Sequence, residues 1–223
     1  SISLAQDTSL NYQTVLDKIE DTYHTQATSL NLANYKLTEL PPEIGKLTHL
    51  TELNLAYNSL EELPPEIRNL KQLRVLILKE NALRVVPAVI LELQSLEKLD
   101  LSKTYLSRLP VAFDTLANLK ILDLSFNGIE GFPSVLANFK KLEWLGLGSN
   151  HLQALPPAIG DLTTLKELSL HNAGLHRLPP EIGNLTQLET LTLSFNNLQD
   201  VPSEFSNLQN LKVLDIRNNI FYV

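Results

Sequence analysis

The chain has 223 residues and a net charge of −7, so it lacks the basic excess of a general nucleic-acid binder. It contains no cysteine, which excludes disulfide bonds and thiolate metal sites. No run of about 18 apolar residues is present, so the sequence predicts no membrane span.

The N-terminal flank, residues 1–26, differs in pattern from the rest of the chain. Within 11–26, Tyr12, Leu16, Ile19 and Tyr23 recur at steps of three and four residues. This spacing predicts one apolar face of an amphipathic helix. We expect the helix to cap the segment that follows, whose first strand edge would otherwise be open.

From residue 27 onward, the prolines mark a strict repeat. The first proline of each motif recurs every 23 residues, at Pro41, Pro64, Pro87, Pro110, Pro133, Pro156, Pro179 and Pro202. The other four of the 12 prolines each follow directly after one of these. A fixed period in the twenties is typical of stacked-repeat proteins, in which each unit buries its apolar side against its neighbours.

Each unit has the form LxxLxLxxNxLxxLPxxIxxLxx, as in LTELNLAYNSLEELPPEIRNLKQ at 50–72. Eight complete units begin at residues 27, 50, 73, 96, 119, 142, 165 and 188, and a partial ninth runs from Leu211 to Val223. The alternating leucines of LxxLxL predict a short strand with one buried face, and successive strands must lie parallel. Because proline lacks an N–H and fixes its own backbone angle, each leading proline marks entry into the return segment.

An asparagine occupies the ninth position of most units. These residues are Asn58, Asn81, Asn127, Asn150, Asn196 and Asn219. A buried asparagine has two donors and an acceptor, so we expect it to satisfy backbone groups of its own and the adjacent unit. Tyr35, Thr104 and Ala173 replace it in three units, and Asn172 is the candidate to compensate for Ala173.

The motif resembles the leucine-rich repeat family, specifically the 23-residue LPxxIxxL class of Ras-group, Roco-type and bacterial proteins. The resemblance covers about residues 27–223. It implies an α/β solenoid: a right-handed horseshoe with a parallel sheet on its concave side, short 3₁₀ or irregular convex segments, and residues 1–26 as its cap. It also implies that the chain is not catalytic and that its concave face binds a protein or peptide ligand.

An alternative remains open at this stage. The repeats of 27–223 could serve as the sensor or targeting arm of a larger multidomain enzyme, such as a Roco-type GTPase or a bacterial effector ligase. In both interpretations this chain itself is not catalytic, takes no cofactor and binds a protein or peptide rather than nucleic acid. We expect a monomer.

No motif in the sequence predicts a catalytic site. GLGSNH at 146–151 lacks the third glycine of a dinucleotide-binding loop. Asp100 and Asp123 occupy the same outward strand position in neighbouring units, so their carboxylates should lie about 5 Å apart. Such proximity raises the pKa of at least one of the two carboxyl groups unless a cation lies near them. The repeat places Lys79, Lys98 and Lys103 near enough to be that cation. The pair is therefore either part of a salt-bridged surface or a site for an ion or a basic ligand.

The outward-facing strand positions predict where a partner binds. They are polar in the end units but apolar in the middle, and the only tryptophan, Trp144, is among them. Gly146 and Gly148 are expected to leave its flank uncovered. The predicted site is centred on Trp144 with Ile121 beside it. Phe126 and Tyr105, one or two units away at the bend side, are expected to complete an apolar and aromatic floor. The site's remaining members are Val75, Ile77, Asp100, Asp123 and His171.

The return side carries a second candidate surface. Two residues after the leading proline, the middle units have Val89, Ala112, Val135 and Ala158, whereas the outer units have glutamates. This apolar stripe is either ordinary scattered surface or a weak interface.

The two ends carry weaker signals. Ser3-Leu4-Ala5 resembles a signal-peptidase cleavage site, although the charged and apolar parts of a signal peptide are absent. We therefore expect either a cytoplasmic or an exported bacterial protein. At the other end, Ile220, Phe221 and Tyr222 form a minimal cap, or the natural chain continues.

Overall fold

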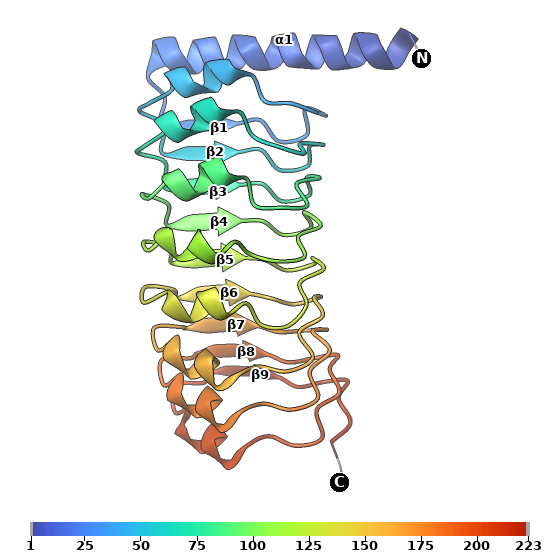
Figure 1. Ribbon diagram of the computed structural model, residues 1–223, viewed down its shortest axis with the longest axis vertical. Helices are drawn as coiled ribbons and strands as arrows, with labels where there is room; N and C mark the ends of the chain where they lie inside the picture. Colours follow the sequence, from blue (N-terminus) through green and yellow to red (C-terminus); the bar gives the residue numbers. More distant parts are fainter. Residues whose placement is uncertain (1, 222–223) are drawn as a thin grey trace.

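The structure is a computed structural model that describes residues 2–221, and the backbone alone for residues 2–10. Helix α1 comprises Ile2–Thr25, and short strands and 3₁₀ helices alternate after it (Figure 1). The strands are β1 (Ser29–Asn31), β2 (Glu52–Asn54), β3 (Val75–Ile77), β4 (Lys98–Asp100), β5 (Ile121–Asp123), β6 (Trp144–Gly146), β7 (Glu167–Ser169), β8 (Thr190–Thr192) and β9 (Val213–Asp215). The 3₁₀ helices are η1 (Pro42–Lys46), η2 (Pro65–Asn69), η3 (Ala88–Glu92), η4 (Val111–Thr115), η5 (Ser134–Asn138), η6 (Pro157–Asp161), η7 (Pro180–Asn184) and η8 (Ser203–Asn207).

The strands form one parallel sheet in chain order, β1 to β9. Each residue pairs with the residue 23 positions later, as Leu30 does with Leu53 and Leu53 with Leu76. The 3₁₀ helices stack on the opposite side of the coil from the strands (Figure 1). The predicted α/β solenoid is confirmed: a right-handed horseshoe with a parallel concave sheet, short convex 3₁₀ segments and a helix at its N-terminal end.

A single continuous core fills the space between the sheet and the 3₁₀ helices. The repeated leucines and the isoleucine of the return segment are fully buried, as Leu53, Leu55, Leu60 and Ile67 illustrate in the second unit. Phe113 and Phe139 take the positions of an isoleucine and a leucine in the middle units and meet edge to face, with ring centroids 5.9 Å apart. The inner units thus bury their apolar sides against neighbouring units.

The asparagines form a hydrogen-bonded ladder along the bend. Asn58 accepts from the Leu37 N–H at 3.0 Å and donates to the Leu32 and Leu55 carbonyls at 2.9 and 2.8 Å. Each later asparagine of the ladder accepts and donates in the same way. Backbone groups that the bend removes from the sheet are therefore satisfied from inside.

In the unit with Ala173 in place of asparagine, the backbone N–H groups find a different partner from the expected one. The Asn172 side chain is exposed and donates to Ser149 Oγ at 3.4 Å, so it does not replace the missing ladder amide. Instead, Oδ1 of Asn196 in the next unit accepts from both the Ala173 and Leu175 N–H groups at 3.0 Å. The suggestion that Asn172 compensates is wrong because its left-handed backbone, with φ of 50°, turns the side chain outward.

That left-handed conformation recurs in every unit, at the residue just before the asparagine position. Its φ lies between 50° and 66° in all nine units, at Asn34, Tyr57, Glu80, Lys103, Phe126, Ser149, Asn172, Phe195 and Asn218. Glycine and asparagine adopt this conformation most readily, and other residues bear a cost of roughly 1 kcal/mol. The ladder bonds on either side of the residue hold it there, and they make its side chain project at the bend.

Helix α1 lies across the N-terminal end of the solenoid (Figure 1). Val15 and Ile19 are fully buried members of the core, and Thr22 is also buried. Tyr23, which we expected on the buried face, is 42% exposed. The inward face is thus rotated from the predicted one, because the helix contacts the first unit along the Val15–Ile19–Thr22 line. Residues 3–5, the cleavage-like segment, belong to this helix.

The last unit packs less completely than the others. Leu214 of β9 is 42% exposed, whereas the equivalent leucines of earlier strands are buried. Phe221 packs against the core while Ile220 is 49% exposed, and Tyr222, the third member of the expected minimal cap, lies outside the described residues.

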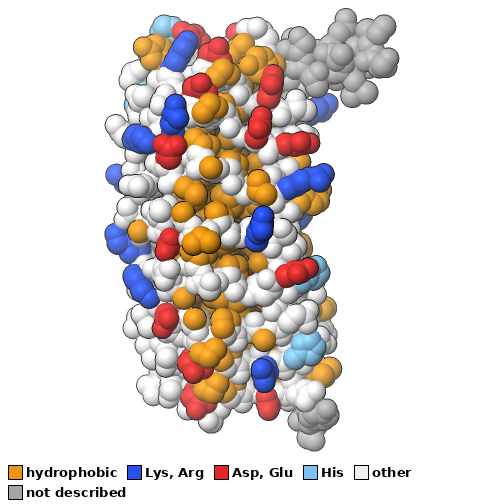
Figure 2. All heavy atoms as spheres, viewed as in Figure 1, with side chains coloured by type: hydrophobic (Ala, Val, Ile, Leu, Met, Phe, Trp, Pro, Cys, Tyr) orange, Lys and Arg blue, Asp and Glu red, His pale blue; other side chains and the backbone are white. Residues whose placement is uncertain are grey.

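The 3₁₀ side carries apolar side chains along its centre, with charged ones on both flanks (Figure 2). Val111 is 92% exposed there, whereas Val89 and Val135 are partly buried and pack against the core. The stripe is therefore less open than its sequence pattern indicates.

Candidate ligand-binding face

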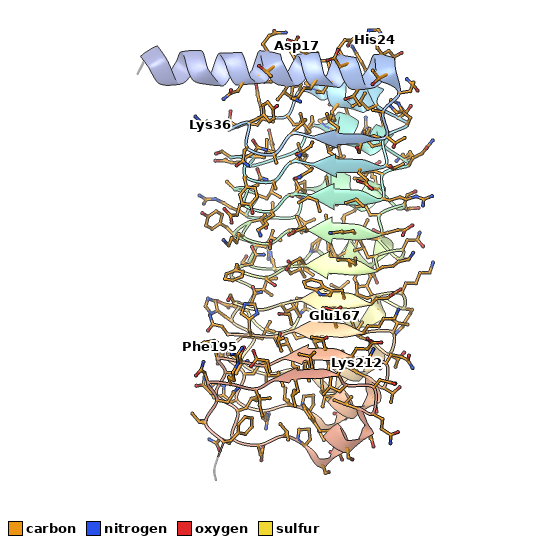
Figure 3. The ribbon with its side chains drawn as sticks, turned by 180° about the vertical axis from the view of Figure 1, so that it is seen from behind. Asp17, His24, Lys36, Glu167, Phe195 and Lys212 are labelled. Atoms are coloured by element: carbon orange, nitrogen blue, oxygen red, sulfur yellow. The ribbon has the colours of Figure 1, made fainter. Side chains whose placement is uncertain are left out.

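The open face of the sheet is built by strand alternation. Within each strand the middle leucine points into the core, and the residues on either side of it point outward. Figure 3 views the molecule from this side, with Glu167 on the strand face, Lys212 at the edge where strands begin and Phe195 at the bend edge. The predicted site residues Val75, Ile77, Ile121 and Trp144 all lie on these strands.

Trp144 lies across Gly146 instead of standing beside uncovered glycines. A Cβ atom placed on Gly146 would lie 2.6 Å from Trp144 Cη2, 2.6 Å from Asp123 Oδ1 and 2.8 Å from Ser125 Oγ. The expectation that the glycine leaves the indole flank uncovered is therefore wrong, because the ring takes the space that a side chain would fill. Trp144 is half-buried on the surface of the sheet, next to Ile121, which is 37% exposed.

His171 covers the second glycine in the same way. Its ring occupies the position that a Cβ atom of Gly148 would take. Ser169 Oγ lies 3.1 Å from His171 Nδ1, and Thr192 donates to Ser169 at 3.1 Å. On its other side, the ring meets that of Phe126, with centroids 5.6 Å apart. The structure thus places His171 and Phe126 together, at the boundary between the strand face and the bend.

Tyr105 lies on the bend side, not on the strand face. It is 72% exposed with a φ of 61°, and it lines a groove of about 420 Å³ together with Phe126, Lys103 and Glu80. Tyr105 is thus at the bend side, as the sequence predicts, and it shares this groove with Phe126; its part in the floor of a site centred on Trp144 stays a prediction. Phe126 belongs to both surfaces, because it lines the groove and contacts His171.

Asp100 and Asp123 face outward from β4 and β5 at directly paired positions. Oδ1 of Asp100 accepts from the Ser102 N–H at 2.9 Å and from its hydroxyl at 2.7 Å. Oδ1 of Asp123 accepts from the Ser125 N–H at 2.9 Å. Burial raises the pKa of Asp123, and the nearby Asp100 carboxylate adds to the rise, while the bonds from Ser125 and the charge of Lys79 oppose it.

The lysines expected to neutralise this pair have other partners. Lys103 donates to Glu80 at 2.7 Å and lies 5.4 Å from the Phe126 ring centroid. Lys79 lies over the Tyr57 ring, 5.8 Å from its centroid. Among the described residues, no ion pair includes Asp100 or Asp123, so the interpretation of a salt-bridged surface is wrong for these two carboxylates.

One feature of the face escaped sequence reasoning. Glu167 is the paired neighbour of Trp144 on β7, and it is exposed. The repeat could have predicted this position, because Glu167 is the third residue of its unit and Trp144 is the third residue of the previous unit. Its carboxylate adds to the acidic character that Asp123 gives the other side of the indole.

Within residues 2–221, no cluster of three or more histidine, aspartate or glutamate side chains is placed to hold a metal ion. In the same described range, no helix combines the length and the apolar character needed to cross a bilayer.

Comparison with known families identifies the repeat. A family model described as "Leucine-rich repeat region" matches residues 5–104 and 157–221, and a second, "Leucine rich repeat", matches residues 94–152. The chain belongs to the leucine-rich repeat family. This family's fold is typically a non-enzymatic interaction module. No curated protein is similar enough to this leucine-rich repeat chain to match it.

Solved structures of other leucine-rich repeat proteins are similar to this one. A leucine-rich repeat protein of Leptospira interrogans has 30% identity and a TM-score of 0.82, and the match covers 92% of this chain and 58% of that one. The leucine-rich repeat domain of the type III effector XopL has 29% identity and a TM-score of 0.72, with 91% and 81% covered.

A third similar structure contains a ligand. It is the ectodomain of the plant receptor kinase GASSHO1/SCHENGEN3 from Arabidopsis thaliana, solved in complex with CASPARIAN STRIP INTEGRITY FACTOR 2. Its identity is 32% and its TM-score 0.75 over 86% of this chain. This leucine-rich repeat chain spans only 24% of the length of that receptor chain and 58% of the Leptospira protein.

Proposed function

We propose that this leucine-rich repeat chain is a non-catalytic module that binds a protein or peptide on its strand face, with Trp144 and Ile121 at the centre. The observation that supports this proposal is the position of the only tryptophan. Trp144 lies outside the core, across Gly146. Core packing does not explain it, because Leu142, Leu145 and Leu147 already fill the core positions of its unit.

The energetics of recognition favour the same place. Tryptophan anchors at the centre of an interface concentrate binding energy, and their truncation typically costs about 2 kcal/mol or more. Trp144 has Ile121 on one neighbouring strand, and the polar side chains of Ser169 and Thr192 lie farther along the sheet. An apolar centre with a polar surround is the usual anatomy of a protein interface.

The similar structures support the class of ligand. Besides the Arabidopsis receptor kinase, the similar structures include the plant peptide hormone receptor RGFR1 in complex with RGF2, and PEPR1 with AtPEP1. These ligands are those of the other proteins, and they indicate for this chain a peptide-like partner rather than a particular peptide. The alternative of a targeting arm within a larger enzyme has no observation of its own in its favour.

The test is a selection of random 12-residue peptides, displayed on phage, against the immobilised chain. Enriched peptides are then synthesised, and their affinities are measured for the wild-type chain, Trp144→Ala and a control. Thr190→Ala is the control. Thr192→Ala would be less suitable, because Thr192 donates to Ser169, whose hydroxyl lies beside the His171 ring. We expect Trp144→Ala to weaken binding by about 30-fold or more and Thr190→Ala to leave it unchanged.

The proposal fails if the enriched peptides bind Trp144→Ala as tightly as the wild type, or if no peptide is enriched above the uncoated surface. Circular dichroism and thermal unfolding of both variants establish that any loss of affinity does not come from unfolding.

A further inference from the structure

The surroundings of Trp144 are acidic on both sides. Asp123 lies opposite Gly146 on β5, and its Oδ1 approaches the same point beside that glycine as the edge of the indole. Glu167 lies opposite Trp144 itself on β7. Asp123 and Glu167 thus belong to the two strands on either side of β6, and neighbouring strands are about 4.8 Å apart.

These carboxylates form no close ion pair, although the charge of Lys79 lowers the pKa of Asp123. None of the ion pairs formed by the described residues includes Asp100, Asp123 or Glu167. This is unusual for the chain, in which glutamates at the strand-entry edge are paired, as Glu143 is with Lys166 at 2.7 Å. Lys98, opposite Ile121 on β4, is the cation of this face that lies nearest in the strand pairing, and it is two strands away from Trp144.

The arrangement fits an organic cation better than a metal ion. Among the side chains that the structure describes, no third ligand joins the aspartate pair, and Oδ1 of each aspartate is already engaged by a serine two residues later. A guanidinium group, by contrast, stacks on an aromatic ring through one face while its edge donates to carboxylates. Tryptophan is the aromatic side chain that attracts such a cation most strongly.

We infer that the partner presents an arginine side chain to this face, with its guanidinium stacked on the Trp144 indole between Asp123 and Glu167. The inference rests on the proposed function, because it specifies the chemistry of the partner at the same site. Charge complementarity identifies the occupant: Asp123 and Glu167 lie on the two strands next to Trp144, and a cation that pairs with Asp123 adds to the stabilisation that the Ser125 N–H already gives its carboxylate. An uncharged apolar peptide would bury these carboxylates without compensation.

The test uses N-butylguanidinium as the probe and N-butylurea as its neutral counterpart of the same shape. Trp144 is the only tryptophan, so the protein labelled with ¹⁵N has a single indole N–H signal. We expect N-butylguanidinium to shift this signal with saturation in the millimolar range at low salt. N-butylurea should produce a shift that is at least about five-fold weaker at equal concentration.

Three variants locate the effect. Asp123→Asn and Glu167→Gln should each weaken the binding of N-butylguanidinium by about three-fold or more, and the double variant by about ten-fold. Glu52→Gln is the matched control, because Glu52 has the same strand position as Glu167 but lies at the far end of the face, on β2. It should leave binding unchanged.

Equal shifts with the two probes, or an affinity unaffected by the double variant, would overturn the inference. Failure of the arginine inference can be distinguished from failure of the proposed function. If selected peptides depend on Trp144 but contain no excess of arginine, and N-butylguanidinium causes no saturable shift, the peptide-binding function stands and the arginine does not. If N-butylguanidinium binds as expected but no peptide depends on Trp144, the peptide-binding function fails while the cation site stands.

Discussion

Thr104 and Asn127 share one hydrogen-bonding arrangement across two neighbouring units. Oδ1 of Asn127 accepts from the Thr104 N–H at 2.9 Å and from the Leu106 N–H at 3.0 Å, and Nδ2 donates to the Leu101 and Leu124 carbonyls. The Thr104 hydroxyl donates to the same Leu101 carbonyl at 2.6 Å, so threonine supplies a donor where asparagine is missing.

Asn127→Ala is expected to lower the free energy of unfolding by about 3 kcal/mol or more, because several buried backbone groups lose their partner at once. Asn219→Ala removes equivalent bonds in the last unit, where the side chain is half-exposed and water can replace them. We expect a loss of about 1 kcal/mol there. Urea unfolding of both variants provides the comparison, and equal losses would contradict the buried ladder as the cause.

The capping contribution of α1 is expected to depend on Ile19 and not on Tyr23. Ile19 is fully buried against the first unit, so Ile19→Ala should cost about 2–4 kcal/mol. Tyr23 is largely exposed, and Tyr23→Ala should change stability by less than about 1 kcal/mol. Thermal unfolding measures both, and a larger effect of the tyrosine would restore the helix face predicted from sequence.

The solenoid could be predicted from sequence because its core positions repeat. Leucine, isoleucine, asparagine and proline recur at fixed places, and each has one physical role that can be assigned without coordinates. The orientation of α1 could not be predicted, because both the Tyr12–Leu16–Ile19–Tyr23 and the Val15–Ile19–Thr22 lines follow helical spacing. Only contact with the first unit selects between them.

The surface is where sequence reasoning was least informative. The outward positions of Trp144 and Ile121 follow from strand alternation. The packing of the indole across Gly146 could not be predicted in the same way, because it depends on the space that glycine leaves by having no side chain. The sequence reading also missed an alternating series of charges at the second position of successive units. It runs through Arg74, Glu97, Lys120, Glu143, Lys166, Glu189 and Lys212, and its lysines donate to glutamates of the preceding units at 2.7–2.9 Å.

Gly146→Ala is expected to displace the indole of Trp144, since the new methyl group would lie 2.6 Å from Cη2. The ring should move toward solvent, and the fluorescence emission of the single tryptophan should shift to longer wavelength. Gly148→Ala is the matched control, because its methyl group would displace His171 instead. Unchanged emission in Gly146→Ala, or an equal shift in both variants, would show that the glycine does not position the indole.

Asp123→Asn is expected to stabilise the chain near neutral pH. Burial, with the Asp100 charge in addition, raises the pKa of Asp123 in the folded chain above its unfolded value, which is about 3.9. For a raised pKa, the contribution of this group to stability is fully present below the unfolded value and is lost as pH rises through the folded value. At pH 7 the ionised carboxylate therefore opposes folding, and the amide removes this penalty while Oδ1 can still accept from the Ser125 N–H.

The melting temperature of Asp123→Asn should accordingly exceed that of the wild type at pH 7, and the difference should shrink as pH falls toward 3.5. Asp161→Asn, at an exposed carboxylate on the 3₁₀ side, controls for the change in net charge. A difference that stays constant between pH 7 and 3.5, or that is matched by Asp161→Asn, would show that the environment of Asp123 is not its cause. Saturating N-butylguanidinium should raise the melting temperature of the wild type at pH 7 more than that of Asp123→Asn, because the cation then compensates the charge that the variant lacks.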